Sequence, residues 1–295
     1  MPQTRTVKEL ELIANTIRQD IIKMLEEAGS GHSAGPLDLA DVFTAMYFDI
    51  LRHNPKNPSW EDRDVFVLSN GHCAPGLYAT LANAGYFDRE ELQTLRKFGS
   101  RLQGHPERLR LPGLETTSGP LGSGLSQAAG MALGMQLNNQ SHRWVYVVTG
   151  DGELDEGNVW EAAMFISKYK LHNVIAIVDR NNIQIDGMTE KVMPLENLRA
   201  KWEGFGWHVQ DIDGHNIQEI IDSCSQARAV VERPSVILAH TIPGKGVDFM
   251  EYDYHWHGIP VGIEDVAGAP PRAEQAKIAL HELRTLRGKI RSEHE

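Results

Sequence analysis

The chain has 295 residues, a composition typical of a globular enzyme, and a formal net charge of −11. The acidic balance argues against a general nucleic-acid binder, because phosphate backbones are held by clustered Lys and Arg. The first residues lack the charged start and apolar stretch of a signal peptide, and no run reaches the length of a membrane span. We therefore expect a soluble, cytoplasmic protein that binds neither nucleic acid nor membrane.

The two cysteines, Cys73 and Cys224, lie in dissimilar contexts and form no CxxC pair. Neither a disulfide framework nor a structural zinc site is indicated, and reduced thiols are expected. Cys73 follows His72, but a small buried cysteine is the favoured interpretation over a Cys/His nucleophile.

Apolar segments of two kinds alternate along the chain. Segments with helical spacing predict helices at residues 7–25, 37–47, 75–84, 125–137, 158–169, 195–205 and 217–231. Short runs rich in Val and Ile predict strands within residues 63–72 and at 144–149, 174–179, 207–212 and 235–240. The first helix is expected to stop at Gly29.

This alternation predicts an α/β fold, namely a doubly wound, mostly parallel sheet with helices on both faces. Ligands then belong at the carboxyl ends of the strands. We expect one domain over residues 1–271, followed by a charged helical tail over residues 272–295. The stretch 99–124, rich in Gly, Pro and Ser, is expected to be a binding loop.

Polar residues follow two successive predicted strands. Asp151 and Asn181 lie about thirty positions apart, the span of one strand-helix-strand unit, so both side chains should face one point if the strands are neighbours. With the backbone carbonyl of Ile183 they would make a hard oxygen site that suits Mg²⁺ or Ca²⁺. Protein oxygens would fill about three of the six positions of Mg²⁺, so ligand phosphates would supply others. The alternative is two ordinary turns.

GDG followed about thirty residues later by NN resembles the thiamine-diphosphate motif of transketolases and related enzymes. Six further stretches look like transketolase signatures, in the order that this family shows. They are SGHSAGP (30–36), SNGH (69–72), LQGHPE (102–107), TTSGPLGSG (116–124), GDGELDEG (150–157) and WHGIP (256–260). The resemblance covers nearly the whole chain.

The resemblance implies thiamine diphosphate as cofactor and assigns residues by position. Asp151, Asn181 and the Ile183 carbonyl would bind the metal, which is Mg²⁺, Ca²⁺ or Mn²⁺. Residues implied to contact the cofactor are His72, Gly119, Pro120, Leu121, Gly152, Asn181 and His257. His32, His105 and His257 would be catalytic and face the substrate, since imidazole can move protons on sugar hydroxyls near neutral pH. Glu156 matches a family acid at the subunit contact near the cofactor.

The full-length transketolases that this chain resembles are about twice as long as it is. Their second domain carries the glutamate that activates the aminopyrimidine ring and the arginines that hold the sugar phosphate. The resemblance therefore implies one half of a transketolase, completed by a separate carboxyl-terminal subunit in a heterotetramer with two copies of each chain. It would transfer a two-carbon ketol unit from a ketose phosphate to an aldose phosphate, as in the pentose phosphate pathway.

Three other interpretations remain at this point. The chain could be the amino-terminal component of a 2-oxo-acid dehydrogenase or a relative of deoxyxylulose-phosphate synthase. A nicotinamide dehydrogenase is weakly suggested by Gly122-Ser123-Gly124, but no GxGxxG follows the first strand of a βαβ unit. A non-catalytic scaffold that keeps the fold is the third alternative.

Overall fold

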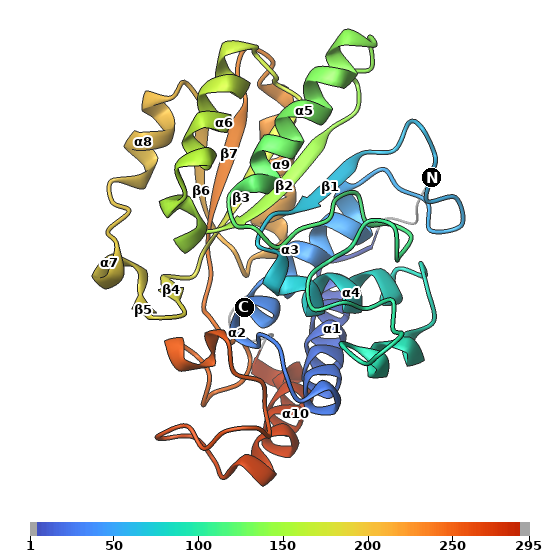
Figure 1. Ribbon diagram of the computed structural model, residues 1–295, viewed down its shortest axis with the longest axis vertical. Helices are drawn as coiled ribbons and strands as arrows, with labels where there is room; N and C mark the ends of the chain where they lie inside the picture. Colours follow the sequence, from blue (N-terminus) through green and yellow to red (C-terminus); the bar gives the residue numbers. More distant parts are fainter. Residues whose placement is uncertain (1–4, 290–295) are drawn as a thin grey trace.

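The computed structural model describes residues 5–289, the last four of them by their backbone alone. Its centre is a five-stranded sheet in the order β1-β2-β3-β7-β6 (Figure 1), in which every neighbouring pair is parallel. The strands are β1 (Val65–Leu68), β2 (Val145–Gly150), β3 (Val174–Arg180), β6 (His208–Asp213) and β7 (Ser235–His240). The predicted parallel sheet is confirmed.

Helices cover both faces of the sheet (Figure 1), because alternate strand residues point to opposite sides and both sides are apolar. One face packs against α5 (Ser123–Leu137), α6 (Gly157–Lys168) and α8 (Leu198–Gly204). The other packs against α1 (Val7–Ala28), α2 (Ala34–Asp38), α3 (Ala40–Ala45), α4 (Ala74–Asn83) and α9 (Ile217–Ala229). The doubly wound arrangement follows from these two cores.

Several predicted boundaries are corrected. The helix expected at 37–47 is instead α2, α3 and a π-helical turn, Met46–Ile50, with Leu39 interrupting at ψ −3°. Helix α8 begins at Leu198 because the Asn197 side chain accepts a hydrogen bond from Ala200 N and caps it. The predicted stop of α1 is confirmed, since Gly29 adopts φ 63° there.

Three short elements after β3 went unpredicted because none is long enough to show a periodic pattern. They are the antiparallel pair β4 (Ile183–Gln184) and β5 (Gly187–Met188), and α7 (Thr189–Val192). Together they form the connection that leaves the end of β3 (Figure 1). Four 3-10 turns also occur in the described chain, at Gly71–Cys73, Arg89–Thr94, Gly152–Asp155 and Tyr254–His257.

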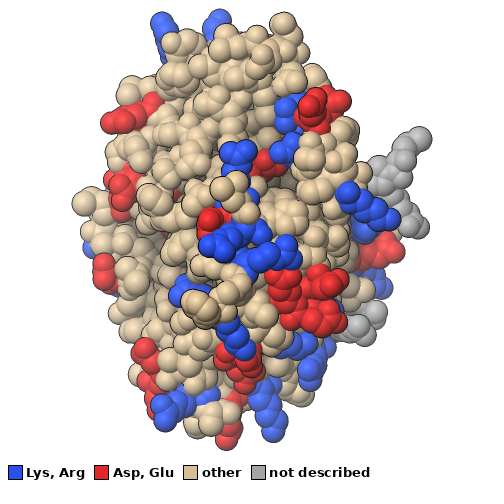
Figure 2. Space-filling model, turned by 45° about the vertical axis from the view of Figure 1, so that its right-hand side comes forward, with Lys and Arg blue, Asp and Glu red and all other residues tan. Residues whose placement is uncertain are grey.

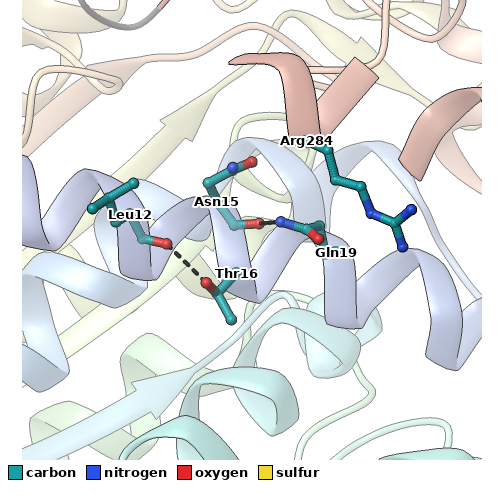
Figure 3. Close-up of a pocket in the computed structure, with 5 residues that line it drawn as sticks. All are labelled: Leu12, Asn15, Thr16, Gln19 and Arg284. Carbon is teal, nitrogen blue, oxygen red and sulfur yellow. Dashed lines mark hydrogen bonds between the residues drawn. The ribbon is translucent and has the colours of Figure 1, made fainter. Parts of the chain in front are cut away.

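The predicted carboxyl-terminal helix is present as α10 (Arg272–Lys289), and it packs along α1. Ala279 and Leu283 are fully buried, and the Asn15 amide donates to the Leu283 carbonyl at 3.0 Å. A pocket of about 300 Å³ remains between the two helices (Figure 3), lined by Leu12, Asn15, Thr16, Gln19 and Arg284. Residues 290–295 of the predicted tail lie outside the described residues.

Charges on the surface are mixed in sign. Figure 2 shows Lys and Arg interspersed with Asp and Glu over the lower part of one face. Among the described residues, no helix combines the length and apolarity needed to cross a bilayer.

A buried acid pair ties the sheet to α2 at the carboxyl ends of the strands. Asp38 from α2 and Asp179 from β3 both accept hydrogen bonds from the Asn181 amide at 3.1 Å, and Thr241 beyond β7 donates to Asp179. Burial and the neighbouring carboxylate raise the pKa of Asp38 well above its usual value. Burial raises the pKa of Asp179 to about 7. The folded chain therefore retains protons that the unfolded chain loses.

This retention predicts a stability that declines with rising pH. The contribution is complete below about pH 4, the unfolded pKa of aspartate, and is lost as pH rises through the raised folded values. The free energy of unfolding should fall by up to about 1.4 kcal/mol per pH unit for each retained proton. Denaturation curves are to be measured at pH 6 and at pH 8.5. Asp38→Asn should reduce the fall in the free energy of unfolding between these two pH values, whereas the control Asp49→Asn, at an exposed position, should leave it unchanged. Equal slopes in all three proteins would contradict the assignment.

Candidate functional site

Asp151 lies directly beyond β2, at the edge where the parallel strands end. Strands β2 and β3 are neighbours, which meets the condition on which the predicted joint site depended, and Gly150 is in register with Asp179. One oxygen of the buried Asp151 carboxylate accepts from Asn182 N at 2.8 Å, and the other accepts from Gly152 N at 2.7 Å. The segments after the two strands therefore touch, and Asp151 and Asn181 share one edge of the sheet.

The Asn181 side chain is held in one orientation. Its amide nitrogen donates to the carboxylates of the acid pair, so its Oδ1 points the other way and accepts from Ile183 N at 3.1 Å. An amide whose nitrogen end is fixed by two acceptors presents its oxygen to the opposite side. The Asp151 carboxylate, Asn181 Oδ1 and the backbone of Ile183 thus lie on the adjoining segments that follow β2 and β3.

Arg180, which the sequence analysis did not single out, contacts the same carboxylate. Its guanidinium donates to Asp151 Oδ2 at 2.8 Å and to Glu190 and Glu196 at 2.6 and 3.0 Å. Burial raises the pKa of Asp151, and Arg180 together with the backbone N–H groups opposes that shift. Asp151 Oδ2 is thereby committed to protein donors, and Oδ1, with one donor, is the freer oxygen.

Three predicted histidines come together from distant segments. His32 precedes α2, His72 follows β1, and His257 ends the 3-10 turn at Tyr254–His257. Their ring centroids lie 4.8 Å (His32–His72), 5.1 Å (His72–His257) and 5.6 Å (His32–His257) apart. Because β1 pairs with β2, His72 brings this cluster to the edge that carries Asp151.

The histidine cluster is neutral at physiological pH. Burial lowers the pKa values of His32 and His257 to about 4, and it lowers the pKa of His72 well below its usual value. The Nδ1 atoms of His32 and His257 are buried without a hydrogen-bond partner among the described residues. An unpaired buried polar atom costs about 1–3 kcal/mol, so these atoms are poised to pair with a polar ligand.

His105 stands apart from the three packed rings. It is exposed, and its ring lies beside Gly119, where an added Cβ would be 4.0 Å from His105 Cγ. Burial and the nearby charge of Arg96 lower its pKa. The structure therefore places His105 on the rim of the site.

The glycine-rich loop packs closely onto the end of β1. A Cβ added at Gly71 would lie 2.8 Å from Ser118 Oγ, and one at Gly124 would lie 2.4 Å from Ser69. Gly122 adopts φ 79°, and a Cβ there would meet Asn158. Only glycine fits these contacts, which explains the composition of the loop.

The remaining predicted cofactor residues lie at the starts of α5 and α6. Pro120 and Leu121 are exposed, Gly119 is half-buried, and Glu156 is exposed next to Gly122 at the N-cap of α6. Gly152 faces Gln184, whose Cβ would lie 3.2 Å from an added side chain. These residues adjoin the histidines and Asp151.

Glu153 is a site residue that sequence reasoning missed. Its buried carboxylate accepts from Gly122 N at 2.6 Å, from Gly150 N at 3.0 Å and from the Ser69 hydroxyl. It thereby joins the glycine-rich loop, the turn after β2 and the end of β1. Its position directly after GDG was visible, but nothing in a segment with several acids shows which one is buried.

Comparison with known proteins agrees with this geometry. Residues 10–274 match the family model described as transketolase, thiamine diphosphate binding domain. The 6-deoxy-6-sulfo-D-fructose transketolase subunit of Clostridium sp. is 46% identical over 256 residues, covering 87% of this chain and 93% of the relative. An apulose-4-phosphate transketolase subunit of Phocaeicola vulgatus is 42% identical over 86% of this chain and 90% of its own.

A solved transketolase from Pichia stipitis, in complex with sedoheptulose 7-phosphate, superimposes with a TM-score of 0.83 at 31% identity. That match covers 97% of this chain but only 45% of the Pichia chain, so this chain spans less than half the length of the solved enzyme. Both family and structure exclude the nicotinamide dehydrogenase interpretation. The matches across nearly the whole chain show that the protein belongs to the transketolase family and that residues 10–274 match the thiamine diphosphate binding domain of that family.

Proposed function

We propose that this chain binds thiamine diphosphate through a divalent metal ion and forms a two-chain transketolase together with a carboxyl-terminal subunit. It transfers a two-carbon ketol unit from a ketose phosphate to an aldose phosphate. The observation that carries this proposal is the convergence of His32, His72 and His257 at the sheet edge that presents the oxygens of Asp151 and Asn181.

The donor set fits a hard divalent cation. Asp151 Oδ1, Asn181 Oδ1 and the Ile183 carbonyl would bind Mg²⁺, Ca²⁺ or Mn²⁺, with diphosphate oxygens completing the coordination. Among the described residues no group of three His, Cys, Asp or Glu side chains could hold a metal alone. The proposed site therefore relies on an amide oxygen, a backbone carbonyl and ligand oxygens besides the Asp151 carboxylate.

The buried polar atoms that lack partners fit a polar cofactor. The unpaired atoms include Asn70 Oδ1, Ser118 Oγ and the Nδ1 atoms of His32 and His257, all on segments that adjoin the site. We propose that His72, Gly152 and His257 approach the diphosphate or thiazolium, and that Gly119, Pro120 and Leu121 line the cofactor. Thiamine diphosphate, when bound between these residues, would supply a nucleophilic carbon and an electron sink for the transfer.

The histidines of this chain would handle protons at the sugar. A neutral imidazole can accept a proton from one hydroxyl and donate one to another, and the lowered pKa values keep His32 and His257 neutral at pH 7. His105, which lies apart from the three packed histidines, would contact other hydroxyls of the substrate. The partner chain would supply the glutamate that activates the aminopyrimidine ring of the cofactor. Glu156 would lie at the contact between the two subunits.

The surface of α5 and α6 offers a place for that partner. Helix α5 contains no charged residue, although Gly130 and Leu137 are exposed on it. Met164 and Phe165 of α6 are also exposed, and the upper part of the view in Figure 2, where these helices lie, is largely free of charged side chains. Exposed apolar surface of this kind marks interaction sites. We propose that the carboxyl-terminal subunit docks here and that two copies of each chain assemble.

Further proposals concern the setting of the enzyme. We propose that residues 1–271 form the cofactor-binding domain with 272–295 as its tail, and that the protein works in the cytoplasm. We propose the sugar phosphates of the pentose phosphate pathway as one class of donor substrate. The sulfo-sugar and the apulose 4-phosphate in the relatives' names are two further donors to be assayed.

Cofactor binding should depend on Asp151. Calorimetry of the wild-type chain should detect thiamine diphosphate binding that requires Mg²⁺, and Asp151→Asn should weaken it by at least about tenfold, since a charged metal ligand is lost. Asp222→Asn, an equivalent change on the exposed face of α9, serves as the control. Metal-independent binding in the wild type would refute the proposed site.

Activity should require the partner. This chain with thiamine diphosphate, Mg²⁺ and fructose 6-phosphate should show no turnover, and adding the carboxyl-terminal subunit should restore it. Gly130→Arg should block complex formation in sedimentation analysis, because a Cβ there meets no atom within 4 Å and the long side chain would project into the docking face. Gly204→Arg on α8, equally open, is the matched control. Robust turnover by the single chain would overturn the proposal.

A further inference from the structure

Arg96 has no carboxylate partner among the side chains of residues 5–285. Arg18 and Arg180, in contrast, each form an ion pair with an acid. No hydrogen bond or ion pair joins the Arg96 side chain to residues 5–285. Its backbone adopts φ 59°, an uncommon conformation for a non-glycine residue, and Arg96 N donates to Leu102 O at 2.9 Å. Such outliers often accompany functional positions.

The Arg96 guanidinium occupies space that two glycines leave open. A Cβ added at Gly104 would lie 3.0 Å from Arg96 Cζ and 3.1 Å from Nε and Nη2, and one at Gly31 would lie 3.8 Å from Nε. Gly31 directly precedes His32, and Gly104 directly precedes His105. The guanidinium therefore sits between the two segments that carry these histidines, and its charge lowers the pKa of both.

With Arg96, the segments that carry the four site histidines form a continuous series of neighbours. His105 lies beside Gly119, Gly119 lies beside Gly71, and His72 contacts His32 and His257. Arg96 is solvent-exposed and lies beside Gly104 and Gly31, which precede His105 and His32. Burial lowers the pKa of these histidines, so Arg96 supplies the full positive charge beside them.

We propose that Arg96 binds the tetrahedral anionic group of the sugar substrate, a phosphate ester or a sulfonate. A guanidinium presents five donors in a planar fork that matches such oxyanions, and it has no competing acid here. The assignment rests on the proposed function for the presence of the sugar. It gives this chain a share in substrate selection, in addition to residues of the partner.

The test uses the protein loaded with thiamine diphosphate and Mg²⁺ and assembled with its partner chain. Binding of fructose 6-phosphate and of 6-deoxy-6-sulfofructose is measured by calorimetry, and turnover of each is compared with that of erythrulose, an uncharged ketose, using uncharged glyceraldehyde as acceptor. The two charged donors separate phosphate from sulfonate recognition. Each is assayed with wild type, Arg96→Gln, Arg96→Lys and Gly104→Ala.

Arg96→Gln should raise the Kd and KM of at least one charged donor by about tenfold or more, because a charge-assisted bidentate contact is lost. Its kcat/KM for erythrulose should change by less than about threefold. Arg96→Lys should recover part of the loss, and Gly104→Ala, which displaces the guanidinium, should reproduce it in part. Lys97→Gln removes the same charge one residue away, from an exposed pair with Glu27, and should have no effect.

Two results would overturn the inference. One is an Arg96→Gln variant that binds both charged donors as tightly as wild type. The other is an equal loss for charged and uncharged donors, which indicates a structural role. If the assembled wild type binds sugar phosphate through Arg96 but transfers no ketol unit, the inference stands and the proposed function fails.

Discussion

The parallel pairing of β2 with β3 is the constraint on which the site depends. It brings the residues beyond two strands to one edge, where Asn182 N donates to the Asp151 carboxylate. Both faces of the strands are buried in apolar cores, which hold this pairing in place. The acid pair behind Asn181 then sets the direction of its amide oxygen. A few hydrogen bonds at the sheet edge thus orient the side chains of Asp151 and Asn181 that we propose as metal ligands.

The site combines a rigid frame with unpaired polar atoms. Glu153 joins three segments of the frame through its hydrogen bonds, and glycines allow those segments to approach one another. Within this frame, buried atoms of His32 and His257 lack partners. A folded protein bears the cost of such atoms where a ligand later satisfies them. The arrangement is consistent with the proposed cofactor entering a largely preformed site.

Sequence reasoning predicted the sheet, most helices and the position of Asp151 and Asn181 beyond the carboxyl ends of two strands, because Val- and Ile-rich strands and strand-end polar residues leave local patterns. It did not find Glu153 or Arg180, whose roles depend on burial and on contacts across the fold. The neutrality of the histidines is also a tertiary property, since it results from burial among one another. Arg96 could not be singled out, because its significance lies in the absence of an acid nearby. The break at Leu39 and the hairpin β4–β5 were too short to leave a periodic signal.

The central claim is that one carboxylate, one amide oxygen and one backbone carbonyl hold a metal that in turn holds a diphosphate. A crystal structure of the chain grown with Mn²⁺ and thiamine diphosphate tests this most directly, because anomalous scattering locates the ion. The account predicts a single strong peak within about 2.0–2.4 Å of Asp151, Asn181 Oδ1 and the Ile183 carbonyl, bridged to the diphosphate. A peak elsewhere, with diphosphate bound away from the ends of β2 and β3, would contradict it.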